Sequence, residues 1–429
     1  MSWFNLKLEP LARTSFRWEK LTECAFPITL VLLEGGVVGV IAAKVYQVSP
    51  LTLAIISAAP MFANLSSFAW NRVASGRPKV SLACLLQVGI LLCVLAVAIT
   101  PINDTGAVVL VASMIISRIL VAGLVTIRSV IWSLNYARSK RAQATGQLQM
   151  IASLVTVIIA SAVGPFLDRY PDGMPWLYAV GVLAGLIGIA FFRRVTVIGE
   201  AEHLQKESEA SSQRRQSVSF VTILRNDRRF AKYQMSMFAA GFGNMLIEAP
   251  LIFLITRELA ASYATSIALT MVIPFTISLV SLPLWARYLD RVHVAQFRAR
   301  QSLLWVVALI LTMLGAVLGS ILWLAISRVV MGIARGGGSL AWQLGHNDFA
   351  KPDQLSAYMG IHVTLTGVRG AIAPLLGMLL YSNLGGISGD GAWVFALAAF
   401  ICGLSGLGFN HLYRQMESDG SIKLSAPAP

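Results

Sequence analysis

Long apolar runs, repeated along the whole chain, constrain the fold of this protein most strongly. An α-helix of about 20 apolar residues crosses a hydrocarbon core of roughly 30 Å, and the runs have this length. In lipid, only α-helices and closed β-barrels satisfy all of their backbone polar groups. A barrel strand needs only about 9–11 residues, so the runs are too long for strands. The sequence therefore predicts an all-α polytopic membrane protein.

The runs form two groups of six on either side of a polar central stretch. We expect twelve transmembrane helices near residues 22–46, 51–70, 80–100, 107–134, 144–166, 175–194, 232–255, 262–286, 300–318, 320–345, 355–381 and 391–412. This pattern predicts a first six-helix bundle over residues 1–194, a cytoplasmic linker over 195–230 and a second six-helix bundle over 231–413. The polar end, residues 414–429, is predicted to be a disordered cytoplasmic tail.

Composition and charge exclude several classes of protein. Charged residues make up only 13% of the chain, whereas soluble domains contain about 25%. A soluble protein with a net charge of +14 would suggest a nucleic-acid partner. Here the basic residues instead lie in loops on one side of the apolar runs, as the positive-inside rule requires, so both termini are predicted to be cytoplasmic. We expect a lipid bilayer and a small-molecule substrate as partners, no nucleic acid, and a monomer.

The sequence shows no sign of a cofactor or an enzyme. The four cysteines form no CxxC pair, and no metal-ligand spacing, nucleotide-binding motif or nucleophile–base set occurs. We therefore predict no metal and no cofactor, and a protein that is not an enzyme. The first apolar run is too long for the core of a cleavable signal peptide, so we expect it to remain as the first helix. The expected location is a bacterial inner membrane.

Rare residues recur at nearly constant offsets in the two halves. The offset is 214 for Glu34/Glu248 and Pro60/Pro274, 215 for Trp70/Trp285 and Arg72/Arg287, and 210 for Ser117-Arg118/Ser327-Arg328. These offsets indicate an internal repeat with loops of different length, and coincidence is the alternative. Parallel repeats are typical of two-bundle transporters, whose substrate site lies near the midplane.

Four of the repeated residues are charges inside apolar runs. Such a charge costs at least about 2.5–3.5 kcal/mol, so it should face a cavity or a partner. We predict that Glu34 pairs with Arg118 and that Glu248 pairs with Arg328. Each pair is either a structural ion pair or a proton or substrate site, because a glutamate whose partner moves can gain and release a proton. Arg128, nearer the cytoplasmic end of its helix, is expected to extend to the interface.

Further polar residues gather in the second half. We expect one side of a cation-rich cavity to be lined by Asn244, Glu248, Arg328, Arg335, His362, Thr366 and Arg369. Arg335 lies seven residues after Arg328, and His362, Thr366 and Arg369 follow one another at spacings that share a helix face. Such a cavity would bind an anionic group. As alternatives, Arg335 extends to the cytoplasmic interface and His362 is a structural histidine.

Two loops and several helical motifs resemble those of the major facilitator superfamily, over nearly the whole chain. The loop Trp285-Ala-Arg-Tyr-Leu-Asp290-Arg291 looks like the family's Asp-Arg loop, and Arg328-Val-Val-Met-Gly332 resembles its fourth-helix motif. The first-half loop keeps Gly76-Arg77 but has Val73-Ala74 where the family has Asp-Arg. The resemblance implies cytoplasmic gating loops that contain Arg72, Gly76, Arg77, Arg287, Asp290 and Arg291. The departure at Val73-Ala74 leaves gating by the first loop open.

The resemblance also implies a function. It suggests a secondary active transporter that moves a small solute by alternating access without ATP, and the intramembrane Glu and Arg residues favour proton coupling. The cation-rich second half favours an anionic solute. The alternatives are a lipid-handling carrier or flippase, a drug or metabolite exporter, and a membrane scaffold or sensor that transports nothing.

Overall fold

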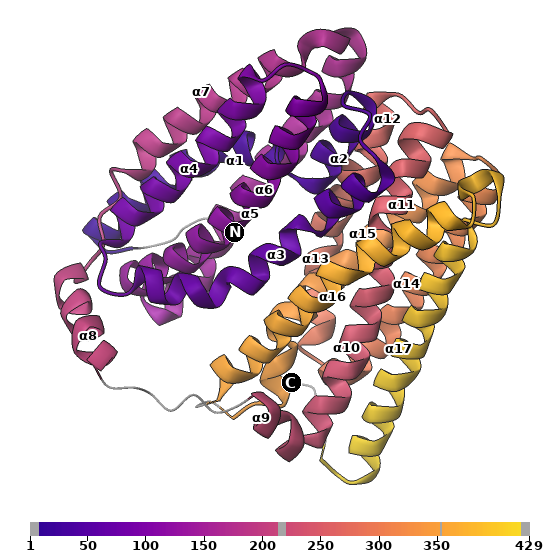
Figure 1. Cartoon of the computed structure of the whole chain (residues 1–429). Coiled ribbons are helices and arrows are strands. Elements are labelled where there is room, and N and C mark those ends of the chain that lie inside the picture. The colour runs from indigo at the N-terminus through magenta and orange to yellow at the C-terminus, as the bar shows by residue number, and fades with distance from the viewer. Residues whose placement is uncertain (1–7, 213–219, 352–353, 422–429) are drawn as a thin grey trace. The chain divides into compact units, whose positions relative to one another are not determined.

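This computed structural model describes residues 8–212, 220–351 and 354–421, and all regular secondary structure in these ranges is helical (Figure 1). No strand occurs in these ranges. Eleven of the helices in them are long and apolar enough to cross a membrane, and Pro50–Ser66 is a shorter apolar stretch. The prediction of an all-α, multi-pass membrane protein is confirmed, whereas the number of twelve spans stays a prediction.

Contacts between residues divide the chain into two compact units. The first unit comprises Met1–Val48 and Phe62–Gln216, and the second comprises Ser49–Met61 and Ser217–Pro429. The boundary after Gln216 falls inside the stretch that the sequence predicts as a linker. Residues 49–61, which belong to the predicted first bundle, make their contacts with the second unit.

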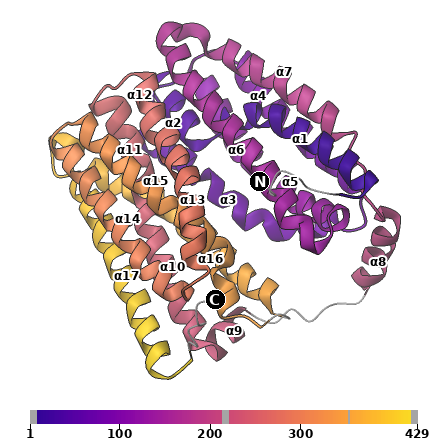
Figure 2. The same ribbon diagram turned by 180° about the vertical axis from the view of Figure 1, so that it is seen from behind.

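The first unit is built from long helices and one helix of the predicted linker. Its elements are α1 (Pro10–Val31), α2 (Gly35–Lys44), α3 (Pro50–Ala74), α4 (Lys79–Ile99), α5 (Asp104–Asn135), α6 (Arg138–Arg169), α7 (Met174–Phe192) and α8 (Glu200–Ser212). The first half of α3 belongs to the second unit by its contacts. Helix α1 packs against α6 and α7, and α4 packs against α5 and α7 (Figures 1 and 2).

The second unit has the same plan with more local distortion. Its α-helices are α9 (Phe220–Asn226), α10 (Arg228–Leu246), α11 (Glu248–Phe253), α12 (Tyr263–Ile267), α13 (Ile273–Leu289), α14 (Val294–Val317), α15 (Ile321–Leu344), α16 (Leu355–Asn383) and α17 (Trp393–Ser418). One π-helical turn, Leu254–Glu258, follows α11, and another, Ala268–Val272, joins α12 to α13. Helix α14 packs against α15 and α17, α13 against α15, and α10 against α16 and α17.

The first span of each half is interrupted at its acidic residue. Helix α1 ends at Val31 and α2 begins at Gly35, with Glu34 as its N-cap residue. In the second half, α10 ends at Leu246 and α11 begins at Glu248. An interruption frees backbone groups that must then be satisfied by neighbouring side chains or in a cavity. Interrupted spans are also where transporters of several folds build their binding sites.

Two tryptophans show that the internal repeat extends to contacts. The indole N–H of Trp70 donates to the carbonyl oxygen of Ile119 at 2.9 Å, and that of Trp285 donates to the carbonyl oxygen of Ile333 at 2.7 Å. In each half, this bond joins the second span to the fourth. Equivalent residues therefore make equivalent bonds, which supports the repeat over coincidence.

The ends of two segments differ from the prediction. Helix α1 begins at Pro10, well before the predicted start at residue 22. The charged residues between 13 and 23 lower the hydropathy there, but Glu19 and Glu23 become buried in the fold and the helix continues through all of them. At the other end, α17 continues to Ser418, and Arg229 bonds to Asp419 at 2.8 Å. The start of the predicted tail is therefore helical, and residues 422–429 lie outside the described residues.

A run of three glycines in α15, Gly336-Gly337-Gly338, allows close packing against α13. A Cβ atom on Gly337 would lie 2.7 Å from the indole of Trp285, which its hydrogen bond to Ile333 holds in place. We expect Gly337→Ala to cost about 1–3 kcal/mol, because the inserted methyl group overpacks this contact. The apparent melting temperature of the purified protein should fall. Gly403→Ala is the matched control, since its Cβ would meet only Val306 at 3.8 Å. Equal melting temperatures for the two variants would contradict this account.

Candidate functional site

The predicted ion pair of the first half is present. Arg118 on α5 donates from Nη2 to Glu34 Oε2 at 2.7 Å and to the carbonyl oxygen of Leu33 at 2.6 Å. The guanidinium group thus satisfies both a carboxylate and a carbonyl that the helix interruption frees. The side chain of Arg118 is 14% exposed and that of Glu34 is 32% exposed, so the pair is shielded but accessible.

The predicted pair of the second half is not formed. Arg328 on α15 is 2% exposed, and it donates to Thr312 Oγ1 at 2.5 Å, to Ser327 Oγ at 2.8 Å and to Met331 Sδ at 3.2 Å. The prediction that it pairs with Glu248 is therefore wrong. Arg328 faces α14, whose threonine hydroxyl satisfies it, and a sequence offset does not determine the rotation of a helix about its axis. Glu248 and Asn244 are half-buried, and the interruption at Ile247 separates them.

The polar face predicted on α16 points into the second unit. His362, Thr366 and Arg369 are all buried. His362 Nδ1 lies 3.1 Å from Gln234 Oε1 on α10, and Trp342 on α15 donates to Thr366 Oγ1 at 3.2 Å. Arg369 donates to the carbonyl oxygen of Met237 on α10. The structure thus brings these three residues together between α10 and α15.

A second buried arginine, which the sequence analysis placed in a loop, lies close to Arg369. Arg298 on α14 is 7% exposed, and it donates to Gln301 Oε1 at 2.9 Å and to the carbonyl oxygen of Gly338 at 3.2 Å. Arg298 and Arg369 are close enough to repel each other, and Tyr233 lies beside both. The signal in the sequence was weak, because basic residues at the end of a transmembrane helix usually reach water.

Several buried polar atoms in this region have no partner in the described part of the chain. They are the Nε donors of Arg298, Arg328 and Arg369 and the Nε2 atom of His362, which is an acceptor when Nδ1–H donates to Gln234. Buried polar atoms are normally hydrogen-bonded, and an unsatisfied one in a native structure calls for an explanation such as an ion or water. We name Arg298, Arg369, His362 and Tyr233 the basic cluster. By contrast, Arg335 is exposed and its guanidinium lies 4.2 Å from the ring centroid of Phe275, so it does not belong to this cluster.

The first unit contains an acidic group that the sequence analysis did not identify. Glu19 and Glu23 on α1 are buried, and both lie near Arg128 on α5. The expectation that Arg128 extends to the interface is therefore wrong, because it pairs with Glu23 instead. Two patterns could have revealed the group, since Glu19 and Glu23 share one helix face at a spacing of four, and Arg128, Trp132 and Tyr136 share another.

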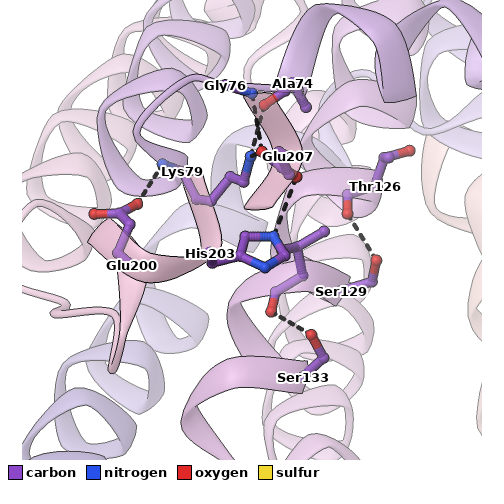
Figure 3. A network of polar contacts seen from close by, with 10 residues as sticks. Ala74, Gly76, Lys79, Thr126, Ser129, Ser133, Glu200, His203 and Glu207 are labelled. Atoms are coloured by element: carbon purple, nitrogen blue, oxygen red, sulfur yellow. Dashed lines mark hydrogen bonds and ion pairs between the residues drawn. The ribbon is translucent and has the colours of Figure 1, made fainter. Parts of the chain in front are cut away.

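The loop between α3 and α4 is held by helix α8 (Figure 3). Lys79, fully buried at the start of α4, donates from Nζ to Glu207 Oε2 at 2.7 Å and to the carbonyl oxygen of Ala74 at 2.6 Å. The backbone N–H of Gly76 donates to the same Glu207 oxygen at 2.9 Å, and Glu200 Oε1 accepts from the N–H of Lys79 at 2.6 Å. Gly76 has φ of +68°, which favours glycine. Helix α8 therefore supplies carboxylates to a loop that lacks the family's aspartate.

The other residues of the predicted gating loops lie on the surface. The structure exposes Arg72, Arg77, Arg287, Asp290 and Arg291. In the second unit, Asp348 accepts from the N–H of Val294 at 2.8 Å, at the start of α14. Asp348, in the sequence His346-Asn347-Asp348, thus has a structural role at a helix end. The gating role of both loops stays a prediction.

The carboxyl of Glu207 links the anchoring of α8 to pH. Burial by itself raises the pKa of this group, but the hydrogen bonds from Lys79 and Gly76, and the charge of Lys79, leave its pKa below the usual value. A lowered pKa means that the ionised group stabilises the folded contact at neutral pH, and that this stabilisation is lost as the pH falls through the lowered value.

We expect Glu207→Gln to release α8 at neutral pH. Glutamine can still accept from Gly76, but it removes the charge that Lys79 needs as a partner. Hydrogen–deuterium exchange in residues 200–212 should become faster, with the rates corrected for intrinsic pH effects, and the wild type should approach the variant only in acid. Glu9→Gln is the control, because Glu9 is exposed at the start of α1. Unchanged exchange in Glu207→Gln would show that the pair does not anchor α8.

Comparison with known proteins agrees with this architecture. The sequence model of the Major Facilitator Superfamily matches residues 28–305 and 235–428. No curated protein sequence matches the chain significantly. Among solved structures, a variant of the nucleoside transporter NupG is similar at 11% identity and a TM-score of 0.72, over 93% of this chain and 100% of that one.

Two further transporters have similar structures. A D-xylose-proton symporter shares 14% identity at a TM-score of 0.69, over 93% of this chain and 97% of its own. A peptide transporter POT in complex with sulfate shares 14% identity at a TM-score of 0.71, over 96% of each chain. At such identities the likeness concerns the fold, whereas the match to the family's sequence model spans most of the chain. The chain belongs to the Major Facilitator Superfamily.

Proposed function

We propose that this protein is a secondary active transporter that couples the movement of a small anionic solute to protons. Membership of the superfamily and the multi-pass helical fold support a transporter of small solutes. The structurally similar transporters are named for a nucleoside, a sugar and peptides, so the fold leaves the substrate open. The charges of this chain supply the argument for an anion.

The basic cluster carries the proposal. Arg298 and Arg369 are both buried and within electrostatic range of each other, and their hydrogen-bond partners in the described residues are carbonyl and amide oxygens without a carboxylate. Two adjacent buried cations repel each other in a medium of low dielectric, so the site gains stability when an anion binds. The unsatisfied Nε atoms offer further donors, and the planar guanidinium group suits carboxylate or phosphate oxygens.

The pair of Glu34 and Arg118 supports coupling to protons. It lies where the first span is interrupted, and Glu34 is partly accessible. A glutamate paired with an arginine is ionised, and it can take up a proton when the arginine moves away. Arg118 also holds the carbonyl oxygen of Leu33, so movement of α5 would change both contacts together.

The test is solute uptake into proteoliposomes with an imposed pH gradient. The panel should contain carboxylates, phosphate esters, cations, neutral solutes and a fluorescent phospholipid. The proposal expects uptake of anions only, with accumulation that depends on the pH gradient. Uptake of cations alone would reject the anionic substrate, and anion uptake indifferent to the gradient would reject the coupling. Movement of the phospholipid alone would favour a lipid carrier instead.

A further inference from the structure

The buried charges at the cytoplasmic half of the first span do not balance. Glu19 and Glu23 on α1 face Arg128 on α5, whose Nη2 bonds directly to Glu23 and lies 3.8 Å from Glu19 Oε2. The exposed fraction of the side chain is 0% for Glu19, 6% for Glu23 and 15% for Arg128. With all three ionised, this acidic group would hold two negative charges and one positive charge away from water.

Neighbouring elements supply no second cation to these carboxylates. Arg128 is the only cation paired with either of them in the described ranges. On α6, Arg141 donates to the carbonyl oxygens of Ser133 and Tyr136. After α7, Arg194 stacks over Trp18, and on α1 itself Lys20 lies over Phe16. No neighbouring cation in the described ranges therefore neutralises the excess negative charge of Glu19, Glu23 and Arg128.

A buried excess charge is costly, and a carboxyl group in such a place takes up a proton instead. We propose that Glu19 holds this proton, and that it is a proton-binding site of the transporter separate from the pair of Glu34 and Arg118. A role of Glu19 in transport rests on the proposed coupling to protons, whereas the protonation of Glu19 does not.

The contacts of Glu19 explain why it holds the proton in preference to Glu23. Glu23 bonds directly to Arg128, whereas Glu19 lies 3.8 Å from it, so the cation is the hydrogen-bond partner of Glu23. Glu19 Oε1 lies 2.6 Å from the hydroxyl of Tyr136, and a hydroxyl can donate to a carboxylate or accept from a carboxylic acid. Trp132, a donor only, bonds to Oε2 at 2.6 Å and leaves Oε1 for the proton.

The same geometry offers a route for release. Arg128 bonds to Glu23 while its Nη2 is within 3.8 Å of Glu19. If the guanidinium group moves from Glu23 toward Glu19, the ionised form of Glu19 is stabilised and its proton leaves from Oε1. Glu23, now without its cation, then becomes the carboxyl that is favoured to take up a proton. When Glu19 releases one proton and Glu23 takes up another, the total charge of the group is the same before and after.

Infrared difference spectroscopy of the purified full chain in lipid tests where the proton is held. The wild type should show the carbonyl band of a protonated carboxyl at neutral pH, and Glu19→Gln should lose it. Glu23→Gln should also lose the band although Glu19 is still present, because Arg128 then has Glu19 as its single carboxylate. Glu9→Gln, at an exposed position of the same helix, should keep the band.

The Glu23→Gln variant keeps the test decisive even if Glu19→Gln misfolds. Glu19→Gln should lose the band because the protonated group is removed, and Glu23→Gln should lose it because Arg128 then pairs with Glu19. A band that survives in Glu19→Gln, or that is absent from the wild type, would overturn the inference. A band lost in Glu23→Gln but kept in Glu19→Gln would place the proton on Glu23 and would also overturn it.

Transport separates this inference from the proposed function. In proteoliposomes, Glu19→Gln should lose accumulation driven by a pH gradient, while exchange of solute without a gradient continues. If accumulation of solute by the wild type does not depend on the pH gradient, the proposed coupling to protons is rejected. The infrared spectra still decide whether Glu19 holds a proton. If Glu19→Gln still accumulates solute with the gradient, the role of Glu19 in transport is rejected while the proposed coupling stands.

Discussion

Replacing Arg369 with alanine should reduce the affinity for the anionic solute by about thirtyfold or more. Loss of one partner from a buried, hydrogen-bonded charge pair costs about 2–5 kcal/mol, and tenfold in affinity corresponds to about 1.4 kcal/mol. Arg369 is buried, lies beside Arg298 and has an unsatisfied Nε atom. Its loss therefore removes both charge and donors from the basic cluster.

The measurement is ligand-induced thermal stabilisation of the purified protein, titrated with the anion that the uptake panel identifies. Arg369→Lys keeps the charge and loses the planar fork, so it should retain part of the affinity. Arg300→Gln is the control, because Arg300 is exposed and bonds to the hydroxyl of Tyr288 at 2.6 Å. Equal affinities for Arg369→Ala and the wild type would show that the cluster is structural.

Replacing Arg118 with alanine should stop coupled transport and destabilise the first unit by about 1–3 kcal/mol, the cost of leaving a polar group without its partner. Glu34 would lose its cation, and the carbonyl oxygen of Leu33 would lose the donor that satisfies it at the helix interruption. Transport should fail because the glutamate no longer has a partner whose movement changes its charge.

A double-mutant cycle tests the pair itself. Adding Glu34→Gln to Arg118→Ala should restore part of the lost melting temperature, because the unpaired carboxylate is removed. Recovery should stay incomplete, since the carbonyl oxygen of Leu33 is still without its donor. Transport should not return in the double variant. If the two changes destabilise additively, the ion pair contributes nothing to stability.

Much of the fold follows from local sequence. Apolar runs determine where the spans lie, because backbone groups in lipid must be satisfied within a helix. Rare charges in those runs predicted the pair of Glu34 and Arg118, since a charge in lipid needs a partner and few are present. Repeated tryptophans indicated an internal repeat, and the equivalent bonds of Trp70 and Trp285 to the fourth span of each half support it.

The same reasoning failed where a side chain had more than one way to be satisfied. Arg328 occupies the position equivalent to Arg118, yet hydroxyl groups of Thr312 and Ser327 take the place of a carboxylate. Arg128 could reach water or a buried acid, and only the packing of α1 against its neighbours shows that Glu23 is the partner. The rotation of each helix about its axis decides which partner a buried arginine meets. A single sequence does not determine this rotation, because it contains no information on which helices contact each other.

By itself, the sequence determined that this chain is a helical membrane protein, indicated an internal repeat, and predicted two intramembrane ion pairs of which one is present, because lipid penalises every unsatisfied polar group wherever it lies. Tertiary structure alone decided which charges are neutralised. Lys79 and Glu207 are 128 positions apart, and Arg298 reaches Arg369 from another helix. Such pairings depend on which helix faces meet, and electrostatic energy falls with distance in space and not with separation along the chain.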